Sequence, residues 1–259
     1  MNEMKGNSMA VFNSNDIYPV SADSELPFEQ HRDIFHLTGI DQEETILLLY
    51  PPSKDDKTRE ILFIRKSDSH TIVWEGEKLS KKLANELSGI DSIYFVDDFK
   101  GILSSIATKV DTFYINKNEH YRANSPVETR EDRFISWLLK KYPAHNVAKS
   151  NPILQRQRSI KHPYEIDQIK RACEITGKGF NRVLKFIKPD IWEYEIEAEF
   201  IHEFINNSSK GFAYSPIIAS GNDNNVLHYI KNNKQCKSGE LILMDVGAEY
   251  GNYSSDMTR

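Results

Sequence analysis

Two aspartates, Asp245 and Asp256, are the residues of this sequence whose type and spacing best suit chemistry. They lie within residues 240–259, where two β-prone runs flank Tyr250-Gly251 and predict a hairpin with a tight turn. If those two residues form the loop, the aspartates stand directly opposite each other on the same face. Their Cβ atoms are then ~4.5–5.5 Å apart, a placement that destabilises like charges unless something compensates.

Three arrangements could compensate this charge: a proton shared by the two acids, an ion pair with a cation such as Arg259, or ligation of metal. Asp245 ends an apolar run, so we expect it to enter a buried environment, where an unpaired carboxylate is costly. Two carboxylates at this distance can bridge ions ~3.5–4 Å apart, and oxygen ligands suit manganese or magnesium. The spacing favours metal. A solvated hairpin stays open as an alternative, because a slip of one residue at Gly251 would separate the side chains across two faces.

The elements that must position this pair precede it in the chain. Apolar spacing predicts one long helix over residues 162–187 and a second helix after residues 190–193, which have capping-box spacing. The pattern then changes to that of strands, at residues 212–219 and 226–230, joined by a cluster of turn-forming residues.

The first half of the chain alternates strand-like and helix-like segments, which predicts a mixed α/β domain. The expected strands are residues 44–50, 61–65, 92–96 and 112–115, and the expected helices are residues 79–87, 98–108 and 127–142. Residues 35–40 are predicted to form a strand end and a glycine turn. The basic residues 146–161 are predicted to be a solvated linker, so the domain boundary is expected between 145 and 160. The histidines of this half lie singly, and a nucleotide-binding glycine spacing is missing from its sequence.

Composition excludes several classes of protein. The 259 residues are 39% hydrophobic and 27% charged, which is enough to bury a core, and no run approaches the ~18 apolar residues of a membrane span. A net charge of -5 makes no case for binding nucleic acid or membrane. The two cysteines provide no disulfide framework, which favours a reducing, cytoplasmic setting.

Residues 243–259, with both aspartates, resemble the metal-binding hairpin of the pita-bread metallopeptidases, in particular the Xaa-Pro aminopeptidases (aminopeptidase P). Residues 214–221 followed by 226–229 are similar to the histidine-bearing stretch of that family. Residues 160–166 resemble the start of its catalytic domain, and residues 32–39 its N-terminal domain. The resemblance implies an α/β (α+β) chain, with a mixed α/β domain at residues 1–150 followed by the first part of a pita-bread domain at residues 151–259.

This resemblance implies a hydrolase that removes the N-terminal residue from peptides whose second residue is proline. Two Mn²⁺ ions would activate a bridging water, with Asp245 binding one ion and Asp256 bridging both. His228 would contact the substrate or assist proton transfer, and Tyr214 would lie near the site. Without the resemblance, a strand histidine and a strand tyrosine are more often packing residues.

The family places a further histidine and two glutamates among its ligands, all after the second aspartate. None of them occurs before Arg259, so we expect an incomplete site and no activity from this chain alone. The expected partners are a peptide substrate and further copies of the chain, with no nucleic acid and no membrane. A prolidase that cleaves Xaa-Pro dipeptides and a non-catalytic homologue that binds peptides or proteins are the alternatives.

Overall fold

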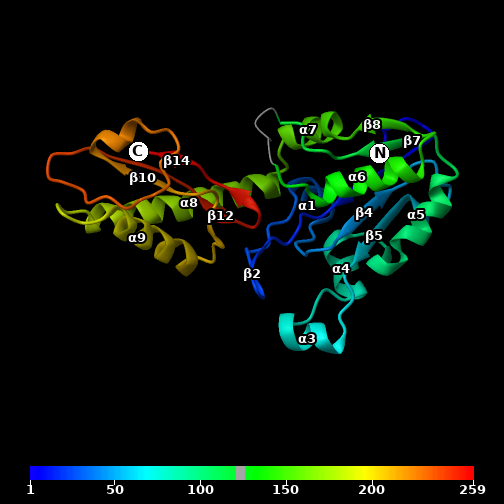
Figure 1. Ribbon diagram of the computed structural model, residues 1–259, viewed down its shortest axis with the longest axis horizontal. Helices are drawn as coiled ribbons and strands as arrows, with labels where there is room; N and C mark the ends of the chain where they lie inside the picture. Colours follow the sequence, from blue (N-terminus) through cyan, green and yellow to red (C-terminus); the bar gives the residue numbers. More distant parts are fainter. Residues whose placement is uncertain (121–125) are drawn as a thin grey trace. The chain divides into compact units, whose positions relative to one another are not determined.

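The computed structural model describes residues 1–120 and 126–259. The chain divides into two compact units, Met1–Ile160 and Lys161–Arg259, and each is described by itself (Figure 1). Among the described residues, no helix combines the length and the apolar character that a bilayer crossing requires.

The first unit is built on a six-stranded sheet in the order β6-β5-β4-β1-β7-β8. All its strands run parallel except β4, which is antiparallel to both of its neighbours. Its strands are β1 (Ser8–Asn13), β4 (Ile46–Leu49), β5 (Glu60–Ile64), β6 (Ser92–Phe95), β7 (Thr112–Ile115) and β8 (Asn146–Lys149).

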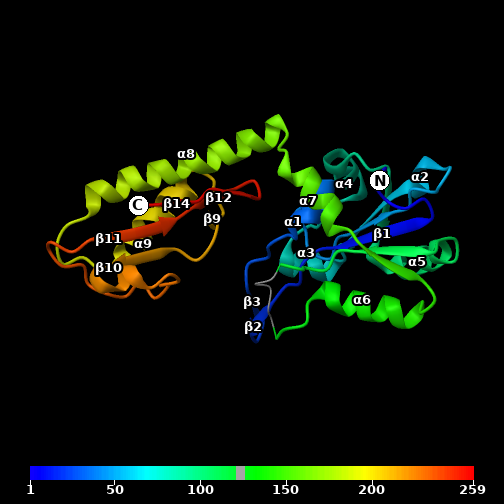
Figure 2. The same ribbon diagram turned by 90° about the horizontal axis from the view of Figure 1, so that it is seen from above.

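Helices cover both faces of this sheet (Figure 2). One apolar core joins the sheet to α5 and α6, and a second core joins the opposite face to α1, α4 and α7. The helices are α1 (Arg32–Thr38), α4 (Lys81–Ser88), α5 (Phe99–Ala107), α6 (Arg130–Lys141) and α7 (Asn151–Ser159). The remaining elements are short: β2 (Pro19–Ser21), β3 (Ser24–Glu25), α2 (Asp56–Arg59), α3 (Ser69–Glu75) and η1 (Val96–Asp98). The mixed α/β architecture expected from the sequence is confirmed.

Three segments of this unit differ from the sequence-based prediction. Residues 35–38 do not end a strand, because they are the last part of α1, whereas the expected glycine turn is present: Gly39 caps this helix in the left-handed conformation with φ 68°. The linker predicted at 146–161 is instead β8 and α7. Leu154 of α7 is buried in the core of the first unit, and the chain divides between Ile160 and Lys161, at the end of the range expected for the boundary. Strand β1, all of whose residues are buried, was not expected at all.

The second unit packs two helices, α8 (Pro163–Phe186) and α9 (Glu193–Asn206), against two small sheets. The helices approach closely at Gly179, where a Cβ atom would lie 2.8 Å from the rings of Phe200 and Phe204. The sheets have the orders β10-β11-β14 and β13-β12-β9. The strands are β9 (Gly211–Phe212), β10 (Ile217–Ser220), β11 (Ile242–Val246), β12 (Ala248–Tyr250), β13 (Tyr253–Ser254) and β14 (Met257–Thr258), and a short 3-10 helix, η2 (Gly221–Asn225), follows β10.

The hairpin that follows β12 has a different loop from the one predicted. Tyr250 pairs with Tyr253, so the two loop residues are Gly251 and Asn252 rather than Tyr250 and Gly251. Both loop residues have positive φ, 58° and 68°. A two-residue hairpin loop of this type requires positive φ at both positions, which glycine and asparagine tolerate and tyrosine resists. The register therefore shifts, and Asp245 faces Thr258 instead of Asp256.

This loop assignment predicts a specific pattern of stabilities. Gly251→Ala is expected to lower the free energy of unfolding by about 1–2 kcal/mol, because alanine is strained at this φ. Asn252→Gly is expected to be neutral or slightly stabilising. Urea denaturation of the two variants checks both values. A clear loss of stability in Asn252→Gly would instead place Asn252 in a strand and restore the predicted loop.

Candidate metal centre

The two aspartates converge even though they do not oppose each other directly. Asp256 lies two residues before Thr258, the partner of Asp245, so the aspartates are diagonal neighbours on one face of the hairpin. The hydroxyl of Tyr214 lies 2.6 Å from Oδ1 of Asp245 and 3.1 Å from Oδ1 of Asp256. The two carboxylates thus meet at a single hydroxyl group. Asp245 is only partly buried, and Asp256 is exposed.

Gly247 allows this convergence. It joins β11 to β12, and a Cβ atom on it would lie 2.0 Å from the carbonyl oxygen of Ser255 and 3.1 Å from the ring of Tyr214. Ser255 is anchored at the same point, because its hydroxyl lies 2.7 Å from that of Thr176 and its N–H donates to the carbonyl of Ala248. The residue before Asp256 is thereby held against β11 and β12, which places Asp256 beside Tyr214.

Tyr214 supplies part of the compensation that two neighbouring carboxylates require. It lies between β9 and β10, which together replace the single strand predicted at residues 212–219. Burial, and then the hydrogen bond to Asp245, raise the pKa of the Tyr214 hydroxyl far above its usual value. The group therefore stays protonated and donates to the carboxylates. Arg259, the cation considered from the sequence, donates to the carbonyl of Thr258, and no ion pair links it to either aspartate in residues 126–259.

His228 lies on the wall of the same pocket. This pocket has a volume of about 470 Å³ and is lined by Tyr214, Ser215, Ile217, His228, Ile230, Asp245 and Asp256. The structure thus brings together the four residues singled out from the sequence, although their roles stay predictions.

The segment that carries His228 is not the strand that its sequence predicted. Residues 226–230 pair with no strand in the described part of the chain, and Leu227 is 90% exposed. The run of β-prone residues was therefore misleading, because a strand also requires a neighbouring strand to pair with. Buried polar side chains hold the segment instead: Glu193 binds Tyr229, and Asn232 binds β10. The sequence did not reveal these two anchors. It predicted a capping box at residues 190–193 that includes Glu193, whereas in the structure Glu195 accepts from the N–H of Trp192 at the start of the helix.

The donors present suit part of a metal shell. Asp245, Asp256 and the Tyr214 hydroxyl are oxygen groups, which hard cations such as Mn²⁺ and Mg²⁺ prefer. Within the described ranges, no group of three or more histidine, cysteine, aspartate or glutamate side chains is arranged to hold a metal ion. The residues therefore fit a divalent cation as two of its ligands, and its other positions must be filled by further donors.

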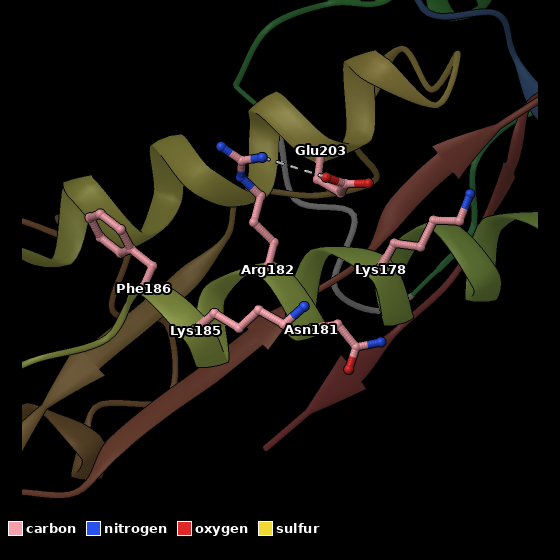
Figure 3. A pocket seen from close by; sticks show the side chains of 6 residues that line it. All are labelled: Lys178, Asn181, Arg182, Lys185, Phe186 and Glu203. Carbon is pink, nitrogen blue, oxygen red and sulfur yellow. Dashed lines mark ion pairs between the residues drawn. The ribbon is translucent and has the colours of Figure 1, made fainter.

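A second pocket, between α8 and α9, has a different character (Figure 3). It has a volume of about 510 Å³ and is lined by Lys178, Asn181, Arg182, Lys185, Phe186 and Glu203. Arg182 is paired with Glu199 at 2.5 Å and with Glu203 at 3.8 Å. Because three of its six lining residues are cationic and its single carboxylate faces an arginine, this pocket does not suit a divalent cation.

Two family models match the chain, one within each of the two units of the structure. Residues 1–114 match the family model of the aminopeptidase P N-terminal domain, and residues 167–259 match that of metallopeptidase family M24. Xaa-Pro aminopeptidase of Escherichia coli is 30% identical over 92% of this chain and 54% of its own length. Human Xaa-Pro aminopeptidase 3 is 28% identical over 95% of this chain and 48% of its own. The chain thus spans about half the length of these relatives.

Solved structures show the same likeness in three dimensions. Escherichia coli aminopeptidase P in complex with substrate superposes with a TM-score of 0.86 at 28% identity, over 99% of this chain and 58% of that one. Proline aminopeptidase P II from Yersinia pestis gives a TM-score of 0.87 at 28% identity, over 99% and 59% of the two chains. The chain thus matches the aminopeptidase P N-terminal domain within its first unit and metallopeptidase family M24 within its second, and it is similar over nearly its whole length to solved aminopeptidases P.

Proposed function

We propose that this chain forms part of a metal-dependent Xaa-Pro aminopeptidase, which hydrolyses the bond between an N-terminal residue and a following proline. The observation that carries the proposal is the convergence of Asp245 and Asp256 on the Tyr214 hydroxyl, in a pocket that His228 also lines. The likeness to Xaa-Pro aminopeptidases and to a metallopeptidase family supports it.

Each residue of the pocket has a proposed task. Asp245 and Asp256 hold the metal, for which we propose two Mn²⁺ ions, and Tyr214 orients their carboxylates through its hydroxyl. His228, exposed on the pocket wall, binds the substrate near the scissile bond or assists proton transfer. When bound, divalent metal lowers the pKa of water and polarises the scissile carbonyl, so the chain needs no nucleophile of its own. We further propose that the enzyme is cytoplasmic and homo-oligomeric.

The same arrangement limits what this chain can do by itself. Two carboxylates leave most of the coordination positions of two octahedral ions to water, so metal affinity is low. We therefore propose that residues outside this chain complete the site.

Activity assays test this function directly. Dialysed chain, assayed with an Xaa-Pro tripeptide and Mn²⁺, is expected to show no turnover. The chain expressed together with any residues encoded after Arg259, here termed the extended protein, is expected to cleave the tripeptide. Turnover by the chain alone would contradict the incomplete site, and no turnover by the extended protein would contradict the function itself. Cleavage of an Xaa-Pro dipeptide in preference to the tripeptide would identify a prolidase.

A further inference from the structure

The segment that carries His228 depends on other parts of the second unit for its conformation. Residues 226–235 lie between η2 and β11 and form no regular secondary structure apart from one bridge between Gln235 and Trp192. The His228 side chain is itself exposed. Its position in the pocket is therefore set by the backbone around it.

Glu193, in the first turn of α9, contacts this segment from inside the unit. Its side chain is fully buried, with 0% exposure. Four hydrogen bonds end on its carboxylate. The Tyr229 hydroxyl and the Lys234 N–H donate to Oε2 at 2.7 and 2.9 Å, and the hydroxyl and N–H of Ser220 donate to Oε1 at 2.7 and 2.8 Å. A buried carboxylate needs such donors to offset the loss of hydration.

The two oxygens of Glu193 join the two sides of the candidate site. Oε2 holds Tyr229, the residue next to His228, whereas Oε1 holds Ser220 at the end of β10. Strand β10 pairs with β11 through Ile217 and Asp245. A single carboxylate thus sets the separation between the histidine segment and the strand that carries the first aspartate.

Asn232 provides a second anchor that does not reach the residue beside His228. Its side chain accepts from the N–H of Ile218 at 2.9 Å and donates to Glu197 and to the carbonyl of Pro216. This anchor holds the far part of the segment. Glu193 therefore has the more direct effect on His228.

We propose that Glu193 is a positioning residue for His228 and acts through the hydroxyl of Tyr229. This inference rests on the proposed function of the site. Burial and the facing Glu193 carboxylate raise the pKa of Tyr229 to about 12, so its hydroxyl remains a donor at neutral pH. In Glu193→Gln an NH2 donor replaces one of the two acceptor oxygens. The donors of Ser220, or those of Tyr229 and Lys234, then lose their acceptor, which loosens the link between β10 and the backbone at His228.

The test measures turnover of an Xaa-Pro tripeptide by the extended protein at saturating Mn²⁺. Glu193→Gln is expected to lower kcat on the order of 10²-fold, because small displacements of a positioned group have effects of that size. Tyr229→Phe is expected to lower kcat about tenfold, and the double variant no more than Glu193→Gln alone, because the two residues act as one unit. Glu195→Gln is the matched control. It changes a carboxylate of the same helical turn that, among the described residues, accepts from the Trp192 N–H alone, and it should retain wild-type kcat.

A second cycle separates positioning from a purely structural role. His228→Ala should reduce kcat strongly in the wild-type background and only slightly in the Glu193→Gln background. Equal reductions in both backgrounds would overturn the inference. If His228→Ala has no effect in the wild-type protein, the proposed role of His228 fails, and if the wild-type protein has no turnover, the proposed function fails.

Amide hydrogen exchange of the chain itself gives a readout independent of activity. Faster exchange is expected in Glu193→Gln at residues 227–234, relative to Glu195→Gln, with β11 and β12 unchanged. Uniformly faster exchange throughout the second unit would show that Glu193 only stabilises the fold and would contradict the inference.

Discussion

Asp256→Asn is expected to lower the kcat/KM of the extended protein for an Xaa-Pro tripeptide by on the order of 10³-fold or more. Asparagine keeps the shape of the side chain but removes the charge that would bridge two cations. Metal-ion catalysis contributes several kcal/mol to the stabilisation of charge in the transition state, and each 1.36 kcal/mol is tenfold in rate. Asp245→Asn is expected to have an effect of the same order, since the Oδ1 atoms of Asp245 and Asp256 both contact the Tyr214 hydroxyl.

The measurement combines steady-state kinetics with a Mn²⁺ titration of each variant. Asp167→Asn is the matched control, because Asp167 is an acidic residue of the same unit that is exposed, near Lys170 and outside the pocket. It should leave both turnover and Mn²⁺ affinity unchanged. If Asp256→Asn retained turnover within a few fold of the wild-type protein, the aspartates would not be metal ligands and the proposed function would lose its main support.

Gly247→Ala is expected to lower the free energy of unfolding of the second unit by about 4 kcal/mol or more. The added Cβ would lie 2.0 Å from the carbonyl oxygen of Ser255, which is backbone and cannot turn away as a flexible side chain can. Losses of this size arise when a well-packed region must shift to admit extra atoms. Because domains are stable by only about 5–15 kcal/mol, a large part of the second unit's stability would be lost.

Gly177→Ala is the control for this variant. Gly177 lies within α8, and a Cβ on it would meet no heavy atom within 4 Å. This replacement should stabilise the unit by about 0.5–1 kcal/mol, because alanine loses less conformational entropy in a helix than glycine. Urea denaturation followed by circular dichroism gives both values, and hydrogen exchange at β11 and β12 assigns the loss to the second unit. A mild effect of Gly247→Ala would contradict the close approach that places Asp256 beside Tyr214.

Local pattern was sufficient where each element depends on its own residues. The strands β4, β5, β6 and β7 and the helices α4, α5, α6, α8 and α9 lie where the sequence placed them. Apolar spacing, turn residues and terminating prolines or glycines act over a few neighbouring residues, so these elements can be recognised in the sequence without knowledge of the fold. The common face of Asp245 and Asp256 also follows from the sequence. The observed pairing differs from the predicted pairing by two residues, and side chains two residues apart in a strand lie on the same face.

Only the tertiary structure decided the features that depend on distant partners. Strand β1 is buried on both faces, so it lacks the alternation of apolar and polar residues that marks a half-buried strand. The place of α7 in the fold depends on the packing of Leu154 in the core. The exact hairpin register came from the positive φ that Gly251 and Asn252 can adopt together. Glu193 lies far from His228 in sequence, yet its carboxylate accepts a hydrogen bond from the hydroxyl of Tyr229, the neighbour of His228. Sequence alone therefore identified the residues of the candidate site, whereas their meeting in one pocket results from long-range hydrogen bonds and packing that no local pattern encodes.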